Sequence, residues 1–95
     1  MQERVTQSTG NVFADLGFER ADVTVLTMRA ELMASIRSVI AEHGWTVQEA
    51  AEKLGIGQKR VSELTRGKPD KFDLDVLVRL AVRVGQKPRL VLHAD

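Results

Sequence analysis

Basic side chains gather in one short stretch of the sequence, residues 58–71. This stretch contains Lys59, Arg60, Arg66, Lys68 and Lys71, accompanied by the carboxylates of Glu63 and Asp70. Ammonium and guanidinium groups concentrated on one face of a small domain can bind the phosphates of a nucleic acid. A charged, solvated surface without a ligand is the alternative interpretation of the same residues. The chemistry that this stretch offers is therefore anion binding.

The charge of the whole chain hides this local excess. The 95 residues carry 14 basic and 13 acidic side chains, which leaves a formal net charge of +1. Residues 1–57 hold five basic and eight acidic residues, whereas residues 58–89 hold nine and four. Aromatic residues make up only 4% of the chain, too few for the modules that stack single-stranded bases on exposed rings. If a nucleic acid is the partner, duplex DNA is favoured.

Other kinds of chemistry find little support in the sequence. Without cysteine there is no disulfide, no thiolate zinc site and no cysteine nucleophile. Asp70, Asp73 and Asp75 lie close together, but the glycine and the distant glutamate of a calcium loop are missing. No apolar run reaches the roughly 20 residues of a membrane span, and the first residues do not resemble a signal peptide. We therefore expect a cytoplasmic protein that is not an enzyme and has no metal or cofactor.

Helices are expected along most of a single domain of residues 10–95, which follows a flexible tail of residues 1–9. The expected helices cover a short turn within 10–21, then 22–43, 47–54, 58–66 and 74–84. The short turn would place Val12, Phe13, Leu16 and Phe18 on the core. Residues 89–93 alternate in hydrophobicity like a short strand. The fold class is thus all-α, with about five helices and a short C-terminal strand.

Residues 46–66 predict two short helices joined by a tight turn. Thr46 and Glu49 have the spacing of a capping box, and Gly55 can adopt the positive φ that begins such a turn. Ala51 is small enough for a close helix crossing, and Val61 is expected to fill the angle between the helices. This is the helix-turn-helix arrangement. The alternative is an ordinary helical hairpin with a solvated outer face.

The stretch WTVQEAAEKLGIGQKRVSELTRGKPDKF resembles the DNA-binding core of the lambda-repressor-like, or Xre-type, helix-turn-helix family. With GNVFADLGF upstream, the long helix between and the strand-like tail, the chain is similar to the subgroup that includes HigA-type antitoxins. The resemblance implies a lambda-repressor-like bundle and a transcriptional repressor. Two departures from the pattern are Val47, where the family often has a phosphate-binding glutamine, and Gly57, where a serine cap is usual.

The resemblance also implies roles for individual residues, because this family inserts its second short helix into the major groove. The side chains expected to read bases are Gln58, Lys59, Arg60 and Ser62. Those expected to contact the phosphate backbone are Thr46, Gln48, Arg66, Lys68 and Lys71.

A homodimer on a palindromic operator is expected from the apolar surplus of the helix 74–84. If Leu74, Leu77, Val78 and Ala81 face the core, a second apolar stripe is left over. The expected dimer interface consists of Val76, Leu80, Val84, Leu90 and Leu92. A slightly apolar core helix with the tail folded back is the alternative.

A toxin is the second expected partner, and the resemblance implies an mRNA-cleaving toxin of the RelE or HigB kind. Such a toxin needs a basic RNA-binding groove, so it would complement an acidic face. The acidic residues of the N-terminal half include Glu3, Asp15, Glu19, Asp22, Glu31 and Glu42. A regulator without a toxin and a protein-binding helical module remain the other interpretations.

Overall fold

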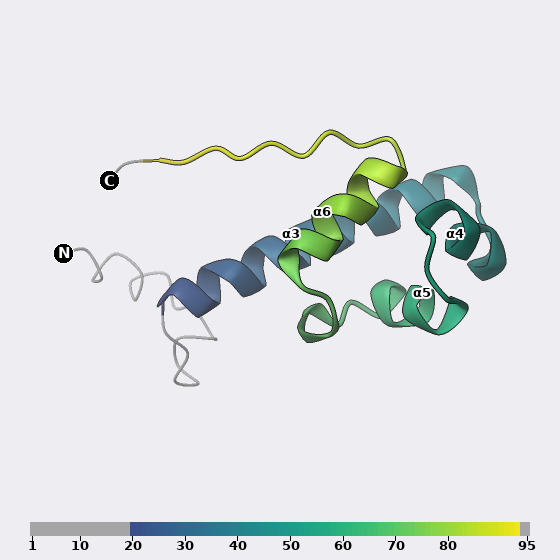
Figure 1. Cartoon of the computed structure of the whole chain (residues 1–95), viewed down its shortest axis with the longest axis horizontal. Coiled ribbons are helices and arrows are strands. Elements are labelled where there is room, and N and C mark those ends of the chain that lie inside the picture. Colours follow the sequence, from purple (N-terminus) through teal and green to yellow (C-terminus); the bar gives the residue numbers. More distant parts are fainter. Residues whose placement is uncertain (1–19, 94–95) are drawn as a thin grey trace.

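The computed structural model describes residues 20–93. They form α3 (Arg20–His43), α4 (Val47–Leu54), α5 (Gln58–Thr65), the 3-10 helix η1 (Pro69–Lys71) and α6 (Leu74–Arg83). The long helix α3 spans the molecule, α6 packs along it, and α4 and α5 lie near its C-terminal end (Figure 1). This part of the chain is all-helical, as the sequence predicted.

The helix α3 already includes Arg20 and Ala21, ahead of the expected start at residue 22, and ends at the predicted residue, His43. Its buried face consists of Val23, Met33, Ile36, Val39 and Ile40, at the spacing that keeps side chains on one side of a helix. Gly44 follows with a φ of 66°, a left-handed conformation that ends helices and favours glycine. The predicted stop of this helix is confirmed.

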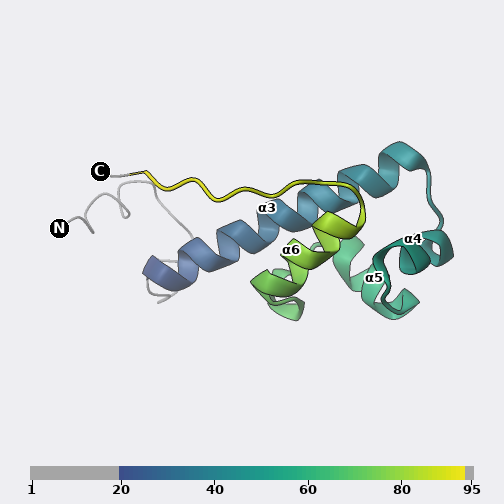
Figure 2. The same cartoon turned by 45° about the horizontal axis from the view of Figure 1, so that its top comes forward.

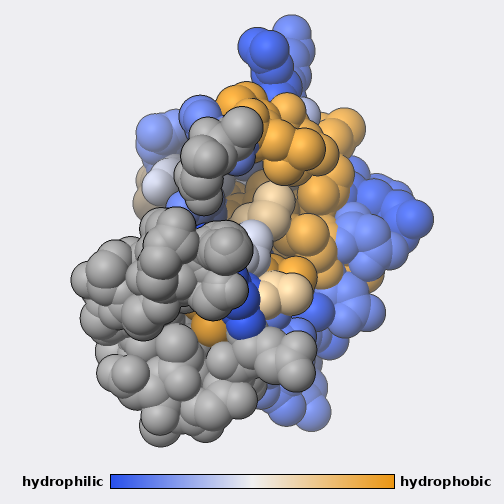
Figure 3. All heavy atoms as spheres, turned by 90° about the vertical axis from the view of Figure 1, so that its left-hand side faces the viewer, coloured by the Kyte–Doolittle hydropathy of each residue, from blue (hydrophilic) through white to orange (hydrophobic). Residues whose placement is uncertain are grey.

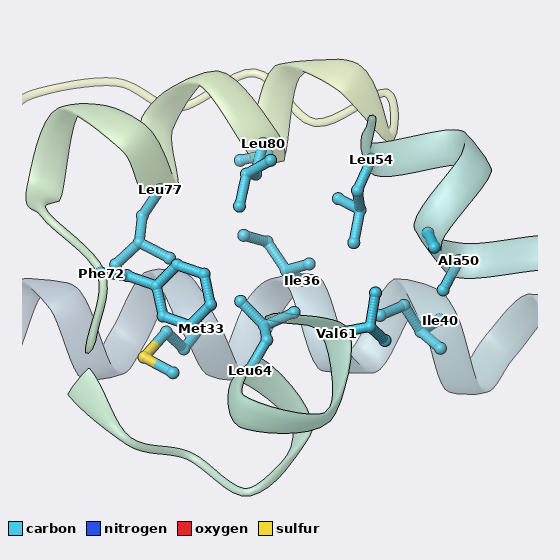
Figure 4. Close-up of a cluster of buried hydrophobic side chains, with 12 residues drawn as sticks. Met33, Ile36, Ile40, Ala50, Leu54, Val61, Leu64, Phe72, Leu77 and Leu80 are labelled. Atoms are coloured by element: carbon cyan, nitrogen blue, oxygen red, sulfur yellow. The ribbon is translucent and has the colours of Figure 1, made fainter. Parts of the chain in front are cut away.

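One hydrophobic core joins α3, α4, α5 and α6 (Figure 4). Met33, Ile36 and Ile40 of α3 meet residues of α4, α5 and α6. Phe72, in the short segment before α6, is among its largest fully buried side chains. Because α3 supplies one wall of the core that also holds α4 and α5, the helix-turn-helix cannot shift without disturbing α3.

The inward face of α6 differs from the one expected. Its buried residues are Leu77, Leu80 and Ala81, and Leu80 is only 3% exposed. Leu80 is therefore a core residue of the single chain, and the expectation that it belonged to a surplus face is wrong. Val78, expected inside, is exposed instead. The buried face of α6 thus combines Leu77 and Ala81 of the expected inward stripe with Leu80 of the other, and the packing of α6 against α3 and α4 determines this face.

Residues 86–93 follow α6 as an extended segment that runs back along α3 (Figures 1 and 2). The side chain of Gln86 fixes its start, because Nε2 donates to Ser35 Oγ at 2.6 Å and to the Ser35 carbonyl at 3.4 Å. The expected strand at 89–93 is not formed in the described residues. A strand needs a ladder partner, and residues 20–93 contain no second strand to supply one.

Two expectations lie outside the described residues: the tail of residues 1–9 and the apolar turn with Val12, Phe13, Leu16 and Phe18. Within residues 20–93, no helix combines the length and the apolar character that crossing a membrane requires.

Candidate nucleic-acid interface

The helix α4 begins with the predicted capping box. The backbone N–H of Glu49 donates to Thr46 Oγ1 at 3.1 Å, and the N–H of Thr46 donates to Glu49 Oε1 at 2.9 Å. Since Thr46 Oγ1 is used in the cap, Thr46 fixes the start of α4 and the direction of its N–H groups. Gln48, in the first turn of the helix, is exposed beside them. Helix N–H groups of this kind can bind a phosphate.

The turn between α4 and α5 is built as predicted around Gly55. This residue has a φ of 73°, and its N–H donates to the Ala51 carbonyl at 2.8 Å. Val61 is 1% exposed in the angle between the helices. Gly57 occupies the N-cap position of α5 without a side-chain hydrogen bond. The turn therefore holds α5 at a fixed angle to α4.

The first residue of α5 lies in a shallow hollow at this turn. The hollow is lined by Gln48, Ala51, Glu52, Gly55, Ile56, Gly57 and Gln58. The structure thus brings Gln48, expected to contact phosphate, to the same surface as Gln58, expected to read a base. Both side chains are exposed, so amide groups that can donate and accept hydrogen bonds are available there.

A second hollow along α5 is lined by four of the five basic residues of the stretch 58–71. Its lining is Lys59, Ser62, Glu63, Arg66, Lys68 and Lys71. Four cations from α5, the following loop and η1 therefore surround one carboxylate and one hydroxyl. Residues that the sequence assigned to base readout and to phosphate contact share this surface, which has the charge that a DNA backbone requires.

Arg60 differs from the other residues expected to read bases, because its guanidinium contacts the protein itself. Its Cζ lies 4.3 Å from the centre of the Phe72 ring, and Nη1 donates to the Lys71 carbonyl at 3.3 Å. Nη1 is also 3.7 Å from Glu63 Oε1. These interactions hold the guanidinium against the protein, and the role of Arg60 in reading a base remains a prediction.

Two further arginines brace the helix-turn-helix and were not singled out from the sequence. Arg37 of α3 donates from Nη1 to the Leu64 carbonyl, near the end of α5, at 3.5 Å. Arg83 of α6 lies against the turn, where its Nη1 would be 2.8 Å from a Cβ added at Gly55. No local motif reveals either contact, since each joins segments far apart in the chain.

The residues expected at a dimer interface fall into two groups. Val76, Leu80 and Val84 belong to the core or pack partly buried against it, whereas Leu90 and Leu92 are 69% and 84% exposed. Leu90 also borders a groove of about 310 Å³, which is lined by Met28, Glu31, Leu32, Ser35, Leu74, Val78, Pro88, Arg89 and Leu90. Figure 3, which views the molecule from the left-hand side of Figure 1, shows hydrophobic residues gathered on this face.

Asp73 and Asp75, at the start of α6, each lie near an arginine. Asp73 occupies the N-cap position of α6 without a capping hydrogen bond from its side chain, and its Oδ1 lies 3.8 Å from Arg29 Nη2. Asp75 pairs with Arg79 at 3.3 Å. In the part of the chain that the structure describes, no group of three acidic, histidine or cysteine residues is placed to hold a metal ion.

These features define a helix-turn-helix protein, and comparison with known families agrees. The model of a helix-turn-helix domain family matches residues 12–92, and the chain belongs to this family. No curated protein matches the sequence. The family supports a DNA-binding regulator, while membership of the HigA-type subgroup remains a prediction.

Proposed function

We propose that this protein is a transcriptional repressor that binds duplex DNA through α5, in the cytoplasm. One observation carries the proposal. The inner side of α5 is fixed in the core by Val61 and Leu64, while its outer side is polar and borders a hollow with four cations. A helix held in this way can enter a major groove without unfolding, and its basic flank can bind the backbone.

The proposed contacts follow from where the side chains lie. Gln58, Lys59 and Ser62 read bases, since an amide suits adenine and an ammonium suits guanine. Thr46 and Gln48 contact one phosphate at the start of α4, whereas Arg66, Lys68 and Lys71 contact the backbone beside the second hollow.

The direct test measures binding to duplexes from the promoter of the protein's own gene. Gln58→Ala should lower discrimination between the operator and single-base variants by about 1–3 kcal/mol. Arg66→Ala should weaken binding to all duplexes about equally. Equal affinity of the unaltered protein for promoter and unrelated DNA would contradict a sequence-specific repressor.

We propose further that two chains form a two-fold dimer, which would match a palindromic operator. The support is the exposed apolar surface of residues 90–92, together with the exposed Val78 and Val82 of α6. Pairing residues 89–93 with the same segment of a second chain would supply the missing ladder partner.

Sedimentation at tens of micromolar tests the dimer. Leu92→Glu should give a monomer, whereas Val47→Glu, at an exposed valine on α4, should leave the dimer intact. Leu80→Glu is unsuitable because Leu80 is buried, and a charge there would unfold the chain. A monomeric unaltered protein would contradict the dimer.

An antitoxin role is the finer proposal. Its support is the resemblance of the helix-turn-helix region and the acidic excess of residues 1–57. The helix α3 contributes little to that excess, since its three carboxylates are balanced by three arginines. Most of the excess therefore comes from Glu3, Asp15 and Glu19, which precede α3 and lie outside the described residues, and the rest comes from Glu49 and Glu52 of α4.

Co-expression with the adjacent reading frame decides between an antitoxin and a regulator without a toxin. An antitoxin predicts that the neighbour arrests growth alone, copurifies with this protein and leaves the DNA surface accessible. If the neighbour neither arrests growth nor copurifies with this protein, the stand-alone regulator is favoured. Absence of any DNA binding would favour the protein-binding module.

A further inference from the structure

The guanidinium of Arg60 joins the middle of α5 to the segment that follows it. Its Cζ lies over the Phe72 ring at 4.3 Å, and its Nη1 donates to the Lys71 carbonyl at 3.3 Å. Phe72 is 1% exposed and belongs to the core, so the ring is a fixed support. An arginine placed over an aromatic ring is held there by attraction between the cation and the ring electrons. Arg60 thereby sets where Lys71 lies relative to α5.

The same guanidinium also faces a carboxylate inside the basic hollow. Glu63 lines this hollow together with Lys59, Arg66, Lys68 and Lys71, and its side chain is 18% exposed. Its Oε1 lies 3.7 Å from Arg60 Nη1. Without Arg60, a partly buried negative charge would lose this partner on the surface where the DNA phosphates are proposed to bind. Repulsion between like charges is strong at such a partly desolvated site.

We infer that Arg60 is a positioning residue rather than a base-reading one. It holds η1 and Lys71 against α5, and it neutralises Glu63 so that the hollow can accept a phosphate. This inference rests on the proposed DNA binding and reassigns one residue within it. It requires no movement of Arg60 when DNA binds, whereas an Arg60 that turned away from the protein to reach a base would weaken these contacts.

A double-mutant cycle on DNA affinity tests the inference. Arg60→Ala should weaken binding about tenfold, and by the same factor for the operator and for each single-base variant. Glu63→Gln in the Arg60→Ala background should restore most of this loss, because it removes the carboxylate that has lost its ion pair with Arg60. Glu63→Gln alone should bind as tightly as the unaltered protein or more tightly. A residue with a purely structural role would not be rescued by removing a charge.

Two controls keep the test decisive. Arg79→Ala removes another ion-paired arginine, on α6 and outside the hollow, and should leave the affinity within about twofold. Arg60→Lys keeps the charge beside Glu63 and should lose less DNA affinity than Arg60→Ala. This variant tests the inference even if the alanine variant does not fold.

The outcomes separate the inference from the proposed function. If the unaltered protein binds no DNA, the proposed function fails before any variant is measured. If it binds and Arg60→Ala loses discrimination at one base pair while other duplexes are unaffected, Arg60 reads a base and the inference is wrong. Failure of Glu63→Gln to restore affinity would also overturn it.

Discussion

The helix-turn-helix buries most of its apolar residues, whereas the C-terminal segment exposes them. In residues 46–66, Ala50, Leu54, Val61 and Leu64 are buried, and the outer face is polar except for Val47 at the start of α4, which is 44% exposed. In residues 86–93, three consecutive apolar residues, Leu90, Val91 and Leu92, are exposed. The first region is complete within one chain. The second leaves apolar surface of the kind that marks an interface, so we expect it to acquire its structure from a partner.

The largest expected effect tests this contrast through stability. Leu54→Ala removes a fully buried side chain and should lower the free energy of unfolding by about 2–5 kcal/mol. Leu92→Ala should change it by no more than about 0.5 kcal/mol. Urea unfolding, followed by circular dichroism at a concentration that favours the monomer, measures both. Similar losses for the two variants would mean that the regions do not differ in the way described.

The glycines with positive φ give the next effect. Gly55 begins the helix-turn-helix turn, and Gly85, with a φ of 90° and open space where a Cβ would lie, begins the C-terminal segment. Alanine at either position should lower the free energy of unfolding by about 1–2 kcal/mol because of backbone strain. At Gly55 the new Cβ also meets Arg83 Nη1, the end of a flexible side chain that can move aside.

The two alanine variants should therefore have similar unfolding midpoints in urea. A much larger loss for Gly55→Ala would show that Arg83 cannot move, and Arg83→Ala in that background should then relieve it.

A smaller effect is expected at the start of α4. Thr46→Ala removes the side-chain acceptor for the Glu49 N–H and should destabilise the protein by about 1 kcal/mol. Thr46→Ser keeps that acceptor and serves as the matched control. Equal unfolding free energies for the alanine and serine variants would show that the capping box adds nothing to stability.

The smallest expected effect is a gain in stability. Gly57 caps α5 without a side-chain hydrogen bond, and serine at this position can supply one. Gly57→Ser should raise the free energy of unfolding by roughly a few tenths of a kcal/mol, the difference between these residues as N-caps. A loss of stability would mean that the φ of −74° and ψ of 161° at this position do not suit a side-chain cap.

The sequence predicted the helix-turn-helix well because its signals are local. Thr46, Glu49 and Gly55 act within one or two turns of the backbone, so their spacing contains the capping box and the turn. The end of the long helix at residue 43 was likewise predicted. Local rules of this kind do not depend on which segments meet in the folded chain.

The misassignments involve packing between distant segments. Leu80 and Val78 both lie on apolar stripes of α6, and only the packing of α6 against the other helices decides that Leu80 is buried and Val78 exposed. The strand expected at 89–93 needed a ladder partner that residues 20–93 do not provide. The contacts of Arg60 with Phe72, of Arg37 with Leu64 and of Arg83 with the turn at Gly55 are also invisible in a linear pattern.

The central claim, that the polar face of α5 and its basic hollow form a DNA interface, is tested most directly by the salt dependence of binding. If a dimer neutralises on the order of 6–10 phosphates, the logarithm of affinity for promoter DNA should fall with the logarithm of salt concentration at a slope of about −5 to −9. Lys68→Ala should reduce the size of that slope by roughly one for each chain bound. A slope near zero, or one unchanged by Lys68→Ala and Arg66→Ala together, would contradict the assignment of this surface.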